Sequence, residues 1–184
     1  GLIDSIGGKE AAEKRLDEMF RRLDASYGDE WFASGNEPSF QIPWIYNWAG
    51  APYKAQQVIR RILNEQYSSR VNGLPGNDDL GSMGAWYVFA SIGLFPEIPG
   101  VGGFSVNSPV FRKIVLHLPE GDVIIKGGDE KKEYIHSLSL DGKKMEGTWI
   151  DWSDLYRGAT LEYKLSGKPD KTWGTRIDPP SYGK

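Results

Sequence analysis

The sequence predicts an α+β fold, in which helices fill the first half and a small antiparallel β unit fills the second. Apolar residues recur about every 3.6 positions up to residue 94, and the period changes to two beyond residue 103. A connector rich in proline and glycine, FPEIPGVGG at residues 95–103, separates the two patterns. We therefore expect a helical part over residues 1–100, and a β appendage with an irregular tail over residues 101–184.

Three segments of the first half predict helices. Between residues 9 and 23 the apolar side chains share one face, and Gly28 follows as a stop signal. A second helix begins near Pro52, a residue suited to a first turn. Its apolar stripe consists of Ala55, Val58, Ile59, Ile62, Leu63 and Tyr67. Four charged residues lie off this stripe: Lys54, Arg60, Arg61 and Glu65. The third helix, within residues 82–94, is apolar nearly all round, which favours burial between other helices.

The second half predicts short strands. Alternating or β-branched runs lie at residues 113–118, 122–126, 133–140, 148–150 and 159–165. Asp141-Gly142 is a strong hairpin-turn signal after the third run. The tail from residue 168 onward is punctuated by proline and glycine, so we expect it to be irregular.

Composition excludes several classes of function. A formal net charge of -3 gives no basic field for nucleic acid or an anionic membrane. No run of eighteen apolar residues occurs, so no membrane-spanning helix is expected. The absence of cysteine excludes disulfides, thiolate metal sites and a cysteine nucleophile. The chain opens with Gly1 rather than Met and has no signal peptide, so we expect a piece of a longer protein.

The loop GNDDLG at residues 76–81 is the first candidate for chemistry. Asp78 and Asp79 stand just ahead of the apolar third helix, where acidic residues commonly cap a first turn. The functional alternative is a carboxylate that acts as a general base on water. Residue types alone leave both interpretations open.

The loop GNEPS at residues 35–39 is the second candidate. It reads either as a plain turn or as a place where Glu37 and nearby carbonyl groups bind a hard cation. Trp44 and Trp48 lie four apart, a spacing more typical of core packing than of a sugar platform. His117 and His136 fall in predicted strands without a third ligand nearby, which argues against zinc.

Three long motifs resemble one protein family. They are GNEPSFQIPWIYNWAGAPYKAQQVIRRIL at residues 35–63, GLPGNDDLGSMGAWYVFASIGLFPEIPG at residues 73–100, and YIHSLSLDGKKM…TWIDWSDLYRGATLEYKLSGKPDKTWG within residues 134–174. Together they resemble glycoside hydrolase family 92, the calcium-dependent α-mannosidases, over almost the whole chain.

The resemblance implies a fold and an activity. Members of this family are secreted exo-acting enzymes that remove mannose from glycans with inversion, and they pair an N-terminal β-sandwich with an (α/α)6 barrel. This chain is then expected to hold the last barrel helices and the β appendage, in a secreted, periplasmic or cell-surface enzyme. Its implied partners are a mannose-containing glycan and the N-terminal part of the same protein.

The resemblance also implies site residues. Asp79 matches the general base, Asp78 is its neighbour in the motif, and Asn77 stands where some relatives carry a second Asp. Asn36 and Glu37 match the region that supplies Ca²⁺ ligands. Phe40 replaces a His of many relatives and, with Trp44, is expected at the substrate.

One family feature is absent from these 184 residues. The general acid of the family comes from an aromatic-rich motif upstream of the stretch that opens here, so we expect the isolated chain to have little or no activity and to self-associate through uncovered apolar faces. Two alternatives stay open: an inactive relative, and a carbohydrate-binding or structural module whose sugar-binding surface consists of Trp149, Trp152 and Trp173.

Overall fold

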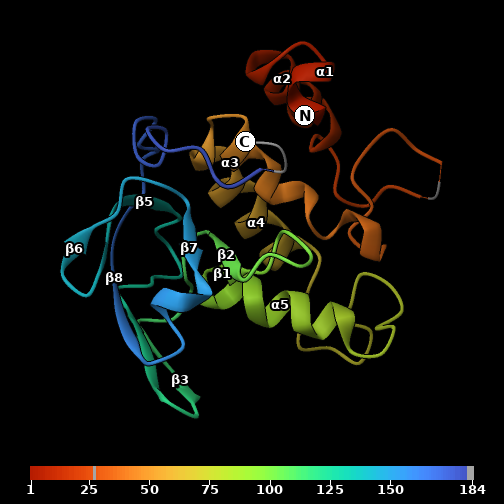
Figure 1. The fold of residues 1–184 in the computed structure, drawn as a ribbon. Coiled ribbons are helices and arrows are strands. Elements are labelled where there is room, and N and C mark those ends of the chain that lie inside the picture. Colours follow the sequence, from red (N-terminus) through yellow and green to blue (C-terminus); the bar gives the residue numbers. More distant parts are fainter. Residues whose placement is uncertain (27, 182–184) are drawn as a thin grey trace.

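Helices and strands follow one another as the sequence predicts, and the α+β class is confirmed. The computed structural model describes residues 1–26 and 28–181. Figure 1 shows most strands gathered on one side of the helices. The α-helices are α1 (Leu2–Ser5), α2 (Lys9–Met19), α3 (Ile45–Trp48), α4 (Pro52–Glu65) and α5 (Ser82–Ile92). The short 3-10 helices are η1 (Glu37–Ser39), η2 (Ile42–Trp44) and η3 (Trp152–Asp154). The strands are β1 (Leu94–Phe95), β2 (Gly103–Val106), β3 (Lys113–Leu118), β4 (Gly121–Lys126), β5 (Tyr134–Leu140), β6 (Lys143–Lys144), β7 (Trp149–Asp151) and β8 (Ala159–Ser166).

Helix α4 begins with Pro52 at its first turn, as predicted, and buries its apolar stripe except for Tyr67, which lies beyond the helix end and is partly buried. The prediction was wrong for Arg60, which is buried rather than off the packed face. Its guanidinium donates to the backbone oxygens of Pro109 (2.9 Å), Asp129 (2.8 Å) and Glu130 (3.1 Å). A charged group can be buried here because backbone oxygens of the β half replace its water.

Two helices differ from their predicted extents. Helix α2 ends at Met19 rather than near residue 23, although Phe20 and Leu23 still enter the core from the following turn. Helix α5 is not buried all round, because Tyr87 is 41% and Val88 is 55% exposed. Within the described residues, α5 packs on one side only, and its other apolar face remains at the surface.

The β half contains two sheets. The larger has the strand order β3-β4-β8-β5-β6, and its β4–β8 pair is parallel, so the sheet is mixed and not wholly antiparallel. The smaller has the order β1-β2-β7, and it uses residues 94–95 and 103–106 at the ends of the predicted connector. The Asp141-Gly142 turn is confirmed between β5 and β6, with φ values of 49° and 78°.

Buried polar groups connect the helices to the strands. Asn47 in α3 donates to the Ser105 hydroxyl of β2 at 2.8 Å, and Gln56 in α4 accepts from the backbone N–H of Ile135 at 2.9 Å. Each side of this junction has its own apolar cluster, one around Trp44 and Ile59 and one around Ile125 and Leu161. Among residues 1–26 and 28–181, no helix combines the length and the apolar character that crossing a bilayer requires.

Candidate active site

The two adjacent acids of the GNDDLG loop have different surroundings. One carboxylate oxygen of Asp78 accepts the backbone N–H of Gly84 at 3.0 Å, and the Asp78 carbonyl accepts the N–H and the hydroxyl of Ser82 at 2.8 and 2.9 Å. Asp78 therefore caps the first turn of α5. The Asp79 carboxyl group takes no part in that cap.

Asp79 begins a run of left-handed backbone. The φ angles are 44° at Asp79, 61° at Leu80 and 87° at Gly81. Only glycine adopts this region freely, so the first two positions carry a conformational cost of about 1–3 kcal/mol each. Through this run the exposed loop turns into the start of α5. The turn comes directly after Asp78, the residue that caps the helix.

The carboxyl groups of Glu37 and Asp79 meet. Glu37 is the first residue of η1, 42 positions before Asp79, and the two side chains hydrogen-bond to each other. The hydrogen bond to Asp79 lowers the pKa of Glu37. The same bond, then desolvation and the charges of Glu37 and Asp78, raise the pKa of Asp79. Two carboxylates in contact repel each other, so the pair holds its last proton more tightly than a separate Asp does.

The remaining residues expected at the site are spread around this acid pair. Asn77 is exposed, and Asn36, in extended backbone just before η1, is partly buried. Phe40 packs partly against the helical core, and its carbonyl accepts the indole N–H of Trp86 at 3.1 Å. Trp44 is 0% exposed and stacks on Phe95 with a centroid distance of 4.1 Å. Because no face of Trp44 is left for a sugar, we assign it to the core instead of the expected substrate contact.

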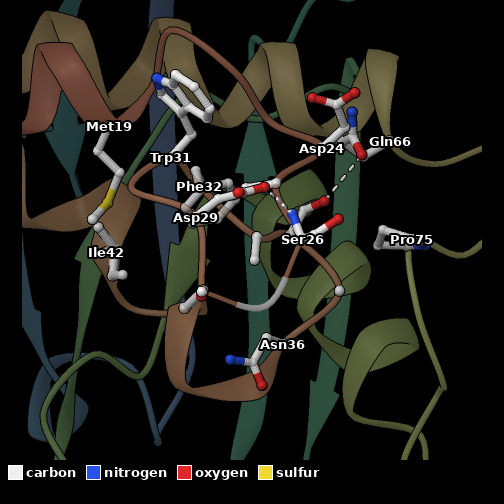
Figure 2. Close-up of a pocket in the computed structure, with 16 residues that line it drawn as sticks. Met19, Asp24, Ser26, Asp29, Trp31, Phe32, Asn36, Ile42, Gln66 and Pro75 are labelled. Carbon is white, nitrogen blue, oxygen red and sulfur yellow. Dashed lines mark hydrogen bonds between the residues drawn. The ribbon is translucent and has the colours of Figure 1, made fainter.

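A cavity of about 530 Å³ adjoins the GNEPS loop and was missed by sequence reasoning. Figure 2 shows Asn36 and Trp31 at opposite ends of it, with Pro75 on one side. Its lining includes Asn36 but none of Glu37, Asn77, Asp78 or Asp79. No sequence motif predicts this cavity, because part of its lining, Gln66 and Pro75, is distant in the sequence from the other lining residues.

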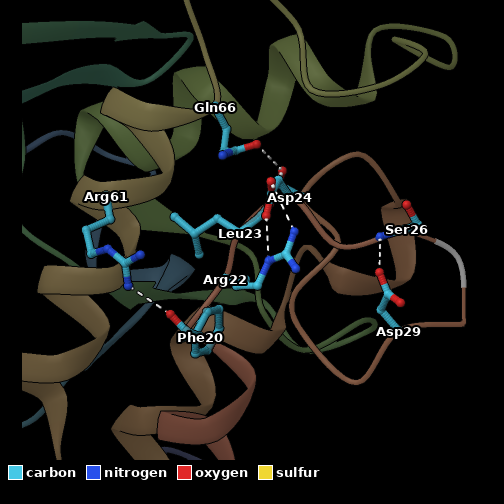
Figure 3. Close-up of polar contacts among 9 residues, drawn as sticks. Phe20, Arg22, Leu23, Asp24, Ser26, Asp29, Arg61 and Gln66 are labelled. Carbon is cyan, nitrogen blue, oxygen red and sulfur yellow. Dashed lines mark hydrogen bonds and ion pairs between the residues drawn. The ribbon is translucent and has the colours of Figure 1, made fainter.

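The wall of the cavity is tied to the helices by polar contacts (Figure 3). The Ser34 hydroxyl bonds both the Leu23 carbonyl and the Gln66 side chain at 3.0 Å, and Arg61 donates to the Phe20 carbonyl at 2.8 Å. The loop that carries Asn36 and Glu37 is thereby attached to the C-terminal end of α4.

The described residues contain no cluster of three or more acidic, His or Cys side chains that could hold a metal by itself. His117 contacts Asp122 at 2.8 Å and His136 contacts Asp170 at 3.2 Å, each a simple pair in the β half. The three Trp residues of the β half form no common sugar-binding surface. Trp173 is buried, Trp149 is partly buried and donates to Asp151 at 2.9 Å, and only Trp152 is largely exposed.

Comparisons with known proteins agree on one family. The model of the glycosyl hydrolase family 92 catalytic domain matches residues 1–167. A protein of Arthroderma benhamiae, described as an uncharacterized secreted glycosidase, is 33% identical over 99% of this chain and 24% of its own length.

Solved structures give the same result. A family GH92 α-mannosidase of Bacteroides thetaiotaomicron aligns with a TM-score of 0.86 and 32% identity over 95% of this chain and 24% of its own, and it has also been solved with mannoimidazole. An inverting family GH92 mannosidase of the same organism aligns with a TM-score of 0.88 and 29% identity over 100% of this chain and 28% of its own. The chain thus spans about a quarter of the length of these relatives. On the family match over residues 1–167, it belongs to glycoside hydrolase family 92.

Proposed function

We propose that this chain supplies the general base and part of a Ca²⁺ site to an inverting exo-α-mannosidase. Residues 1–100 would form the end of its (α/α)6 barrel, residues 101–184 its β appendage, and an N-terminal part of the same protein the rest. The observation that carries the proposal is the meeting of Glu37 and Asp79, which come from separate loops and hydrogen-bond to each other.

Asp79 is the better placed of the two adjacent acids. Asp78 is held by the first turn of α5, so its carboxylate is already occupied. Asp79 is exposed and takes no part in the cap, so its carboxylate can accept a proton from water. Exposed Asn77 lies two residues earlier and can orient the attacking water through its amide group.

Glu37 cannot be the acid that completes the reaction. Inversion needs a general acid and a general base about 6.5–9.5 Å apart, so that a water and the sugar fit between them. A direct hydrogen bond between Glu37 and Asp79 leaves no such space. We therefore place the general acid on the N-terminal part, and the isolated chain is expected to be inactive.

Glu37 fits a role as a metal ligand instead. Ca²⁺ takes about 6–8 oxygen ligands, and two carboxyl groups in contact offer the hard oxygens that a divalent cation binds. The Glu37 carboxylate and an oxygen of Asn36 would supply part of the shell, and the remaining ligands would come from other parts of the enzyme and from the sugar. When bound, Ca²⁺ would hold sugar hydroxyl groups and favour ring distortion. Calorimetric Ca²⁺ titration of the wild type against Glu37→Gln tests this role.

The relatives support the proposed substrate and location. One relative is named an α-mannosidase and has been solved with mannoimidazole, which supports a terminal α-mannoside of a glycan as substrate. Phe40, beside η1, offers ring contact at the substrate where a His would donate a hydrogen bond. The secreted description of the fungal relative supports a secreted, periplasmic or cell-surface location. With a net charge of -3, we expect neither nucleic acid nor membrane as a partner.

The test is steady-state kinetics on an aryl α-mannoside, in the longer protein to which we assign this chain. Asp79→Asn is expected to lower kcat by about 10²–10⁴-fold, the usual range for a general base. Asp78→Asn, the matched control, is expected to change kcat far less. Equal losses in the two variants would contradict the assignment, and proton NMR of the released mannose must show the β anomer first.

A further inference from the structure

The two loops that carry the acid pair touch through their backbones at a pair of glycines. A Cβ atom added to Gly35 would lie 2.5 Å from the carbonyl oxygen of Pro75, and one added to Gly76 would lie 2.6 Å from the carbonyl oxygen of Gly35. Neither glycine has a positive φ. Glycine is therefore required here for close approach and not for an unusual backbone conformation.

This contact stands next to the residues of the proposed site. Asn36 and Glu37 follow Gly35 directly, and Asn77, Asp78 and Asp79 follow Gly76. The Glu37 and Asp79 carboxyl groups, which hydrogen-bond to each other, are thus two and three residues from the point of closest approach. Any side chain at either glycine must push one backbone away from the other.

We propose that Gly35 and Gly76 are positioning residues, whose backbone contact sets the distance between Glu37 and Asp79 and so holds the base in register with the cation-binding loop. The catalytic role of this contact rests on the proposed function, but the close approach of the two backbones does not. Two other constraints support the arrangement. The Asp78 cap fixes the GNDDLG loop to α5, and the Ser34–Gln66 bond fixes the GNEPS loop to α4, so the glycine contact joins two anchored loops.

The first measurement is the crystal structure of the longer protein and of its glycine variants, which gives the distance between the Glu37 and Asp79 carboxyl groups. The wild type is expected to show the two groups in contact, and Gly76→Ala and Gly35→Ala to show them separated. Gly84→Ala is the matched control, because a Cβ there meets only Asp78 Oδ1 at an ordinary 3.7 Å. It is expected to keep the contact between Glu37 and Asp79.

The second measurement is kinetics of the same variants in the longer protein. A displaced base is expected to lower kcat by about 10–100-fold with little change in KM, while Gly84→Ala stays near wild type. The inference is overturned if either glycine variant keeps the wild-type distance and kcat, if the wild-type carboxyl groups lie apart, or if both variants unfold the protein, since the contact would then hold the fold and not the site. If the longer protein has no mannosidase activity, the proposed function fails, and the measured distance still decides the positioning role.

Discussion

Two acidic residues of this chain hold their protons more tightly than ordinary carboxyl groups, and they do so in opposite surroundings. Glu97, just after β1, is 7% exposed, its Oε2 has no hydrogen-bond partner, and burial raises its pKa to about 9. Asp79 lies on an exposed loop, and a hydrogen bond to Glu37 is the main cause of its raised pKa. A raised carboxyl pKa therefore has two different physical origins in this chain.

The difference teaches where function is to be sought. Desolvation alone, as at Glu97, has a cost in stability and needs no second group. A shift caused by a specific partner from a distant loop requires two segments to be held together, and such pairs mark functional sites more often. The helix–sheet junction and the acidic loops differ in burial as well: the polar contacts of the junction are buried, and the GNDDLG loop is exposed.

Replacing the buried acid is expected to give the largest effect on stability. The folded-state pKa of Glu97 lies above its unfolded value, so the folded chain binds the extra proton and stability falls as pH rises from about 4.5 toward 9. Glu97→Gln removes this loss, and we expect the variant to be more stable than wild type by about 3 kcal/mol at pH 8 and little different at pH 4. Urea unfolding at both pH values measures it.

The control for that variant is Glu30→Gln, which changes an exposed acid. It is expected to change the free energy of unfolding at pH 8 by less than about 0.5 kcal/mol, as is usual for a surface substitution. An equal stability of wild type and Glu97→Gln at pH 8 would show that Glu97 is not desolvated in solution.

The helix–sheet junction gives the next largest effect. Gln56→Leu leaves the buried N–H of Ile135 without an acceptor, and we expect a loss of about 2 kcal/mol in the free energy of unfolding. The adjacent Gln57 is exposed, so Gln57→Leu is a matched control with an expected change below about 0.5 kcal/mol. Similar losses in the two variants would mean that the junction does not depend on this bond.

The smallest effect separates the two adjacent acids. Asp78→Ala removes the cap of α5 and is expected to lower stability by about 1 kcal/mol. Asp79→Ala removes no cap and relieves the contact with Glu37, so we expect no loss. Thermal unfolding of both variants checks the comparison, which fails if Asp79→Ala is the more destabilised of the two.

Most of the fold could be predicted from the sequence, because helix α4 and strands β3, β5 and β8 follow simple periodicity. What periodicity misses depends on tertiary partners. Arg60 is buried because carbonyl groups of a distant segment surround it, and β4 and β8 pair in parallel although neither run signals direction. The exposed face of α5 was also missed, because an apolar sequence does not show which neighbours cover it.

The candidate site, too, could be predicted from the sequence only in part. Sequence reasoning singled out both acidic loops, but residue types alone could not show that Asp78 caps α5 and that Asp79 does not. The contact of Asp79 with Glu37 depends on the backbone approach at Gly35 and Gly76, which no spacing in the sequence records. Trp44 was expected at the substrate, although its spacing from Trp48 already favoured core packing, and it stacks on Phe95 in the core.

The most direct test of the central claim is azide rescue of Asp79→Ala in the longer protein. Azide is a small anionic nucleophile that needs no general base, so it can take the place of the activated water. We expect azide to restore turnover of an activated aryl α-mannoside by Asp79→Ala and to yield β-mannosyl azide, with no such gain in Asp78→Ala. Turnover by Asp79→Ala that is near wild type without azide, or rescue of Asp78→Ala instead, would contradict the assignment of Asp79 as the general base.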